Sequence, residues 1–147
     1  MPSSSTTAPI HFSFPAEISL RERTRLKTFL ATLFRREKTS LGELQYVFCS
    51  DSYLLDINRQ YLKHDYYTDI ITFDLSDPGH PVTAEIYISV DRVRENAREF
   101  SSSVQKELHR VIFHGALHLC GYTDKGEQAE KEMRKMEDKY LSLYFKR

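Results

Sequence analysis

The chain has 147 residues, with 21 basic and 21 acidic side chains that cancel to a formal net charge of zero. A chain of this length forms one domain with a substantial core, and its neutral balance produces no global field that would attract a nucleic acid or a membrane. Any polyanionic partner must therefore be held by a local patch. No stretch approaches the apolar length of a membrane span, and the N-terminus lacks the pattern of a signal peptide. We expect a cytoplasmic protein in which Cys49 and Cys120 stay reduced.

Residues 1–9 are expected to form a flexible tail and residues 10–147 a single domain. Runs of β-forming residues with alternating or continuous apolar character predict four strands. These strands are expected over residues 10–14, 43–49, 70–75 and 84–90.

Apolar residues at three- and four-residue spacing predict five helices. They are expected over residues 19–38, 51–62, 91–100, 104–119 and 127–146, with the first three capped by Ser19, Asp51 and Asp91. The second helix is expected to bury an apolar face that includes Tyr61. The order of elements predicts an α/β (α+β) fold, with one roughly four-stranded mixed sheet packed by about five helices.

The first helix carries several arginines away from its apolar stripe, at positions 21, 25, 35 and 36. Such a charged face is usually a solvated surface and less often a contact with RNA.

The segment of residues 109–125 carries the strongest chemical signal in the chain. His114 and His118 are four residues apart on a predicted helix, so both rings can lean toward one point. Gly121 is the first residue beyond the apolar run that can adopt a left-handed cap, and past this turn Asp124 can fold back. Two imidazoles and a carboxylate, with one position left for water, are typical of a catalytic zinc site. By spacing alone, this interpretation and ordinary packing of the histidines are about equally favoured.

Gly115 limits the chemistry of this segment. A peptidase of the HExxH type needs a glutamate directly after the first histidine, and Gly115 occupies that position. A glycine inside a helix costs about 1 kcal/mol relative to alanine, which indicates that another element approaches closely. Hydrolysis of a different electrophile by zinc-bound water remains open.

The segment from His114 to Tyr122 reads HGALHLCGY and resembles the HGxLHLxGY signature of the YbeY family of metal-dependent endoribonucleases. Residues 67–73 (YTDIITF) and 85–89 (EIYIS) resemble two further segments of that family. Asn58 matches an upstream asparagine, and Met133 and Glu137 match an M-x-x-x-E pattern in the last helix. The resemblance implies a small sheet flanked by helices, in agreement with the elements above.

The resemblance also implies an activity: a zinc-dependent endoribonuclease, specific for single strands, that acts in ribosomal RNA processing. That role includes 3′-end maturation of 16S ribosomal RNA and ribosome quality control. One Zn²⁺ per chain, or another divalent metal, would be held by His114, His118 and Asp124. The implied partners are single-stranded or ribosomal RNA, the ribosome or its small subunit, and a ribosome-associated GTPase.

Asp124 departs from the family pattern, which usually has a third histidine at this position. A carboxylate is a competent zinc ligand, although a harder and anionic one that is expected to tolerate Mn²⁺ better. The alternative is that Asp124 only caps a turn.

A second departure concerns the positive charge that would hold a phosphodiester. Many members carry an arginine where this chain has Leu62, so Arg59 or Lys63 is expected to supply the charge. Glu85 and Asp69 are expected to position a water or a histidine N–H.

Two other functions remain open. One is a metal-dependent hydrolase with a different substrate, such as a peptide or a small ester. The other is a non-enzymatic module in which zinc only braces the last helix and the protein acts by binding the ribosome.

Overall fold

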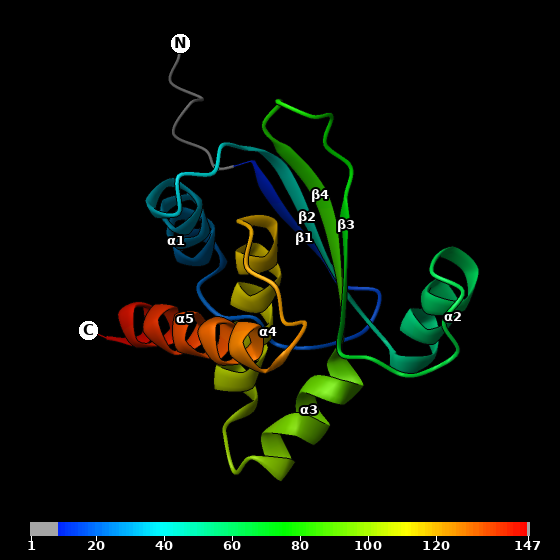
Figure 1. Ribbon diagram of the computed structural model, residues 1–147. Coiled ribbons are helices and arrows are strands. Elements are labelled where there is room, and N and C mark those ends of the chain that lie inside the picture. Colours follow the sequence, from blue (N-terminus) through cyan, green and yellow to red (C-terminus); the bar gives the residue numbers. More distant parts are fainter. Residues whose placement is uncertain (1–8, 147) are drawn as a thin grey trace.

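The computed structural model describes residues 9–146, so that residues 1–8 of the expected tail and Arg147 lie outside the described residues (Figure 1). Between these limits, the strands are β1 (Ile10–Ser13), β2 (Leu41–Cys49), β3 (Ile70–Asp74) and β4 (Val82–Ser89). The helices are α1 (Arg23–Arg36), α2 (Asp51–Tyr61), α3 (Val90–Glu99), α4 (Val104–Leu119) and α5 (Glu127–Phe145). The predicted fold class, with its order of elements, is confirmed. No helix within residues 9–146 is long and apolar enough to cross a membrane.

The strands form one mixed sheet in the order β1-β2-β4-β3. β1, β2 and β4 run parallel to one another, and β3 runs antiparallel along β4. The two inner strands, β2 and β4, bury more side chains than the two edge strands. The outer position of β3 brings its first residue close to α4.

Helices cover the two faces of the sheet unequally. Figure 1 shows α1, α4 and α5 on one side of the sheet, α2 on the other, and α3 below the strands. Tyr46, Phe48, Ile86 and Ile88 point toward the three-helix side and belong to the main core. A smaller cluster on the α2 side contains Val47, Cys49, Leu54 and Ile71. Because successive strand residues point to opposite faces, the sheet separates two chemically different surfaces.

The helix α4 lies directly against the sheet at Gly115. A Cβ atom built on Gly115 would lie 2.9 Å from Cδ1 of Ile86 and 3.0 Å from Cδ1 of Ile70. One turn earlier, the hydroxyl of Tyr46 donates a hydrogen bond to the carbonyl of Ile112 at 2.8 Å. The predicted close approach at Gly115 is therefore confirmed, and it sets the distance of His114 and His118, on either side of it, from the sheet.

The helix starts differ from the sequence prediction. α1 begins at Arg23 rather than at Ser19, because Glu22 takes a left-handed conformation with φ 52° that a helix cannot include. The caps of α2 and α3 are Ser50 and Ser89, whose hydroxyls each accept a hydrogen bond from an N–H of the first turn.

The aspartates expected as caps have other partners. Asp51 forms a two-pronged ion pair with Arg92, and Asp91 accepts a hydrogen bond from the backbone N–H of Asp51 at 2.8 Å. These contacts join the start of α2 to the start of α3.

Candidate active site

His114 is held by a carboxylate from the last helix. Its Nδ1 lies 2.6 Å from Oε2 of Glu137, in the middle of α5. Glu137 is buried, and the imidazole is about one-fifth exposed. An ionised Glu137 accepts the hydrogen bond, so the proton sits on Nδ1 and the lone pair on Nε2.

Arg110 fixes the other side of the same carboxylate. Its Nη1 donates to Oε1 of Glu137 at 3.0 Å, and its Nη2 donates to Oδ1 of Asp138 at 2.8 Å. Arg110 is one turn before His114 on α4 and is largely buried. A buried ion pair is stabilised when further hydrogen bonds satisfy both groups, and Arg110 orients the carboxylate of Glu137 in this way.

Asp124 returns to His114 from the loop after α4. Its Oδ2 lies 3.4 Å from Nε2 of His114, and its side chain is half exposed. The chain turns at Gly121, where φ is +106°, a conformation that favours glycine. The phenol of Tyr122 then donates to Oε1 of Glu37 at 2.9 Å, which ties this loop to the end of α1.

Two further carboxyl groups belong to this region: Asp69, which is half-buried and acts on His114, and Glu107, which is buried on α4. Burial raises the pKa of Asp69, although the charge of His114 opposes the increase. Burial likewise raises the pKa of Glu107, against the effect of Arg110. For His114 itself, burial lowers the pKa, but the hydrogen bond and charge of Glu137 outweigh it and the net direction is upward. The site therefore concentrates negative potential around one imidazole.

This donor set suits a divalent cation at His114 and Asp124. A ligating histidine usually donates its second ring N–H to a carboxylate, and Glu137 accepts such a bond here. The other predicted ligand, His118, is exposed one turn later on α4. Within residues 9–146, no three histidine, cysteine or acidic side chains are gathered tightly enough to form a complete metal site. The structure therefore brings together two of the three predicted ligands.

The predicted basic residues lie on α2 and the loop after it. Nε of Arg59 is 2.5 Å from Oδ1 of Asp65, and the side chain is about half exposed. Lys63 is exposed and takes a left-handed conformation with φ 57°. Asn58 is buried and donates to the carbonyl of Tyr66 at 2.8 Å, so it shapes the loop that carries Lys63. The same loop continues to Asp69 beside His114.

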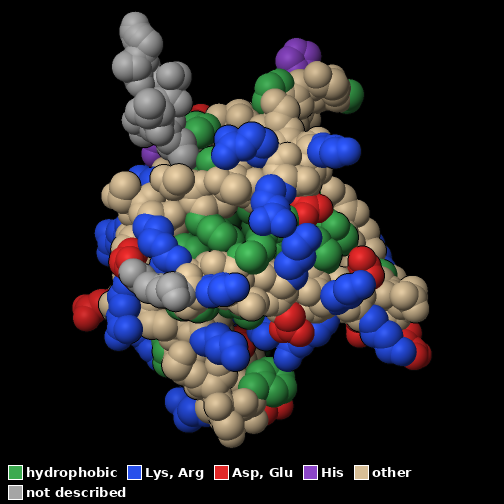
Figure 2. Space-filling model, turned by 90° about the vertical axis from the view of Figure 1, so that its left-hand side faces the viewer, with side chains coloured by type: hydrophobic (Ala, Val, Ile, Leu, Met, Phe, Trp, Pro, Cys, Tyr) green, Lys and Arg blue, Asp and Glu red, His purple; other side chains and the backbone are tan. Residues whose placement is uncertain are grey.

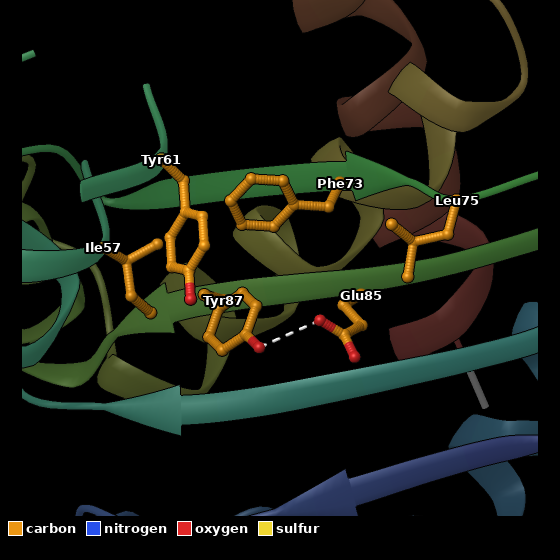
Figure 3. A pocket seen from close by; sticks show the side chains of 6 residues that line it. All are labelled: Ile57, Tyr61, Phe73, Leu75, Glu85 and Tyr87. Atoms are coloured by element: carbon orange, nitrogen blue, oxygen red, sulfur yellow. Dashed lines mark hydrogen bonds between the residues drawn. The ribbon is translucent and has the colours of Figure 1, made fainter. Parts of the chain in front are cut away.

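Glu85 lies on the other face of the sheet. Its neighbour Ile86 faces Gly115 of α4, so Glu85 points toward the α2 side. There Oε1 of Glu85 accepts a hydrogen bond from the hydroxyl of Tyr87 at 2.9 Å (Figure 3). The structure does not bring Glu85 to the cluster around His114.

The pocket that contains Glu85 has a volume of about 250 Å³ and is lined mainly by aromatic and aliphatic side chains. Tyr61 forms part of its wall and is 64% exposed, so the prediction that it is buried was wrong. The reason is that α2 covers only part of this face: the ring of Tyr61 meets Phe73 edge to face and leaves the pocket open.

Sequence reasoning did not assign a role to Arg110, Glu107 or Glu137, although Glu137 belonged to the matched M-x-x-x-E pattern. An isolated charge in an amphipathic helix has the same appearance whether it is exposed or buried. The available signal was that Glu107, Arg110 and His114 repeat at the spacing of one helix face.

The chain is similar to known proteins over most of its length. The sequence profile described as "Endoribonuclease YbeY" matches residues 15–144. The chain is 50% identical to "Endoribonuclease YbeY" of Cytophaga hutchinsonii over 132 residues, which are 90% of this chain and 92% of that protein. It is 45% identical to the protein of the same name from Flavobacterium psychrophilum, covering 92% of this chain and 96% of that protein.

The fold is similar to that of TM1509 from Thermotoga maritima, known from a solution structure. The TM-score is 0.62 at 28% sequence identity, and the alignment covers 92% of this chain and 89% of that one. The fold of this α/β domain thus has a counterpart among solved structures. The profile and the identities show that the chain belongs to the YbeY family of endoribonucleases.

Proposed function

We propose that this chain is an endoribonuclease that cleaves single-stranded RNA during ribosomal RNA processing, including 3′-end maturation of 16S ribosomal RNA, and in ribosome quality control. Membership of the YbeY family supports the nuclease activity. The observation that carries the assignment to a site is the orientation of His114, with Nδ1 on Glu137 and Nε2 toward Asp124. The role implies a cytoplasmic protein that works with the ribosome or its small subunit and a ribosome-associated GTPase.

The proposed cofactor is one divalent metal, zinc in the first instance, with His114, His118 and Asp124 as ligands. Imidazole and carboxylate donors in this combination match catalytic zinc sites. The buried carboxylate of Glu137 and the acidic side chain of Asp69 add negative potential that favours a cation. For the exposed His118 to take part, its ring must turn toward Asp124.

In the proposed mechanism, the metal supplies Lewis acidity to a phosphoryl oxygen or to a water when it is bound. Glu137 keeps the proton of His114 on Nδ1, so that Nε2 stays available toward Asp124. Arg110 in turn holds the carboxylate of Glu137 in place from its other side. Arg59, on α2, or Lys63, in the loop that leads to Asp69, would neutralise charge on the phosphodiester. Glu85 lies across the sheet from His114, so the mechanism assigns it no direct contact with the metal ligands.

The direct test combines metal analysis with RNA cleavage. His114→Ala, His118→Ala and Asp124→Ala are compared with His80→Ala and Asp77→Ala, which remove the same side-chain types from the exposed loop between β3 and β4. We expect the first three to lose metal and cleavage of a single-stranded RNA, while both controls keep them. Full metal content in Asp124→Ala would remove Asp124 from the ligand set.

The alternative functions give different results in the same preparation. Cleavage of casein that is lost in His114→Ala, together with intact RNA, would identify a hydrolase of another substrate. A structural metal would give two results together. Chelation would unfold the protein, and the metal-loaded protein would show no more nuclease activity than the Asp124→Asn variant.

A further inference from the structure

A second groove lies between the start of α4 and the end of α5. Its volume is about 650 Å³. Arg21, Lys106 and Arg110 contribute positive charge to its lining, and Asp138 is the acidic residue among the lining side chains. Phe145, which is 45% exposed, forms part of the wall. The groove therefore combines cations with an accessible aromatic ring.

One side chain, Arg110, links the walls of this groove and of the candidate active site. Arg110 donates to Glu137, which holds His114, and also to Asp138, which lines the second groove. Arg110 is only 14% exposed and is bound on both sides, so the wall between the two spaces is a fixed ion-pair cluster. A ligand long enough to occupy both spaces would pass over α5 at this point.

The two grooves differ in charge. The groove at His114 has a volume of about 510 Å³, and its lining carries more acidic than basic side chains, with Asp124, Glu127, Glu130 and Glu137 against Lys131 and Arg134. Such a lining attracts a metal but repels the phosphates on either side of the cleaved bond. In the second groove, Arg110 is already offset by its two carboxylates, so the exposed Arg21 and Lys106 provide the net positive charge.

The surrounding surface has the same sign. Figure 2 shows Lys and Arg side chains around an apolar centre on the face turned to the left in Figure 1, where α1 and the end of α5 lie. The guanidinium of Arg25, on α1, lies 4.0 Å from the ring centroid of Tyr144, the residue before Phe145. Because the whole chain is neutral, this is a local separation of charge of the kind that tracks a polyanion.

We propose that the groove formed by Arg21, Lys106, Arg110 and Phe145 binds the backbone of the single-stranded RNA on one side of the cleaved phosphate. Arg21 and Lys106 contact phosphates, and Phe145 stacks on a base. The inference rests on the proposed function and extends it to a substrate-binding subsite. It predicts that long strands gain affinity from this groove and that strands too short to pass Arg110 do not.

The test is binding of a fluorescent 2′-O-methyl single strand of about 20 nucleotides, which greatly exceeds the footprint of a small domain, at several salt concentrations. The Arg21→Ala/Lys106→Ala double variant is compared with the Arg98→Ala/Lys38→Ala double variant, which removes two exposed cations elsewhere. We expect the first variant to bind about tenfold more weakly at low salt and its salt slope to fall by about 1.4, since each phosphate contact on a single strand contributes about 0.7. The control should retain the slope of the unmodified protein.

Two further measurements define the result. Phe145→Leu, which keeps an apolar side chain against Tyr144, should weaken binding about fivefold with an unchanged salt slope, as loss of stacking predicts. Cleavage of an RNA of about four nucleotides should be equal in the unmodified protein and the Arg21→Ala/Lys106→Ala variant.

An unchanged salt slope in that variant, with normal cleavage of long RNA, would overturn the groove but leave the nuclease assignment intact. Equal losses for short and long RNA would also overturn it, because the residues would then act at the cleavage site. If the unmodified protein neither binds nor cleaves single-stranded RNA, both proposals fail together.

Discussion

Glu137 accepts a hydrogen bond from Nδ1 of His114 at 2.6 Å, and the two residues are 23 positions apart in the chain. The contact couples the packing of α5 on α4 to the direction of the imidazole. The orientation of a candidate ligand is thus set by a helix that carries none of the predicted ligands.

Replacing Glu137 by glutamine should weaken metal binding. The variant keeps the shape of the side chain but loses the charge that draws the Nδ1 proton and the ion pair with Arg110. Loss of such a supporting carboxylate typically lowers metal affinity about 10- to 100-fold. The measurement is competition with a chelating indicator. Asp138→Asn is the matched control, because Asp138 pairs with Arg110 but not with His114; an equal loss in both variants would show that only the arginine matters.

Tyr122 should affect the site through the loop that carries Asp124. Tyr122 and Tyr140 donate to the two oxygens of the same carboxylate, Glu37, but Tyr140 is on α5. Removing either hydroxyl should cost about 1 kcal/mol of unfolding free energy. We expect Tyr122→Phe, and not Tyr140→Phe, also to lower metal affinity, as measured by calorimetric titration. Equal metal affinity in the two variants would show that the hydrogen bond of Tyr122 does not affect metal binding.

Gly115→Ala should destabilise the fold despite the better helix propensity of alanine. The added methyl group would lie 2.9 Å from Cδ1 of Ile86, which is fully buried. Overpacking of this kind costs about 1–3 kcal/mol, against a gain of about 1 kcal/mol in propensity. Urea unfolding should show a net loss. In an Ile86→Val background, which removes that Cδ1 atom, the loss should be smaller, and strict additivity would contradict the steric explanation.

Asp124→His tests whether the aspartate replaces a ligand. The variant introduces the residue type that the family pattern usually has at this position, and a neutral imidazole is as competent a zinc ligand as a carboxylate. Metal content should be retained in Asp124→His and lost in Asp124→Ala, with a shift of metal preference from Mn²⁺ toward Zn²⁺ in the histidine variant. Elemental analysis after dialysis provides the measurement. Retention of metal in both variants would favour the turn-capping alternative.

His109 should make the fold less stable at acid pH. It is 2% exposed, its Nδ1 lies 2.6 Å from the carbonyl of Gln105, and among the described residues its Nε2 has no hydrogen-bond partner. Burial lowers the pKa of His109, and the positive charge of Arg25 lowers it further, whereas the hydrogen bond with the carbonyl of Gln105 raises it. At acid pH the unfolded chain therefore binds more protons than the folded one, and the free energy of unfolding rises with pH until the ordinary histidine pKa of about 6.5 is passed.

The measurement is urea unfolding of the protein and of His109→Gln between about pH 5 and 8, a range that brackets the ordinary histidine pKa. The stability advantage of the unmodified protein should shrink as the pH falls, because the variant has no group to protonate at this position. His80→Gln, on an exposed loop, is the control and should keep the full pH dependence. A constant difference between the protein and His109→Gln would exclude this contribution.

The candidate metal ligands and the turn between them could be predicted from the sequence. The spacing of His114 and His118, the glycine turn at Gly121 and the return of Asp124 depend on residues within one helical turn or one loop. Short-range sterics and helix geometry determine such features. The close approach at Gly115 could be inferred for the same reason, since a helical glycine has a cost that only packing can offset.

Only the tertiary structure decided which of these residues meet. Glu137 and Arg110 reach His114 because α5 crosses α4, and Glu85 is directed away from it because β4 alternates its side chains between two faces. Tyr61 is exposed because α2 covers only part of its face of the sheet. Each outcome depends on how long-range packing places one element against another. The residue pattern within a single helix or strand does not indicate which element packs against it. For this protein, sequence determined the candidate ligands, and the packing of α4, α5 and the sheet determined their surroundings.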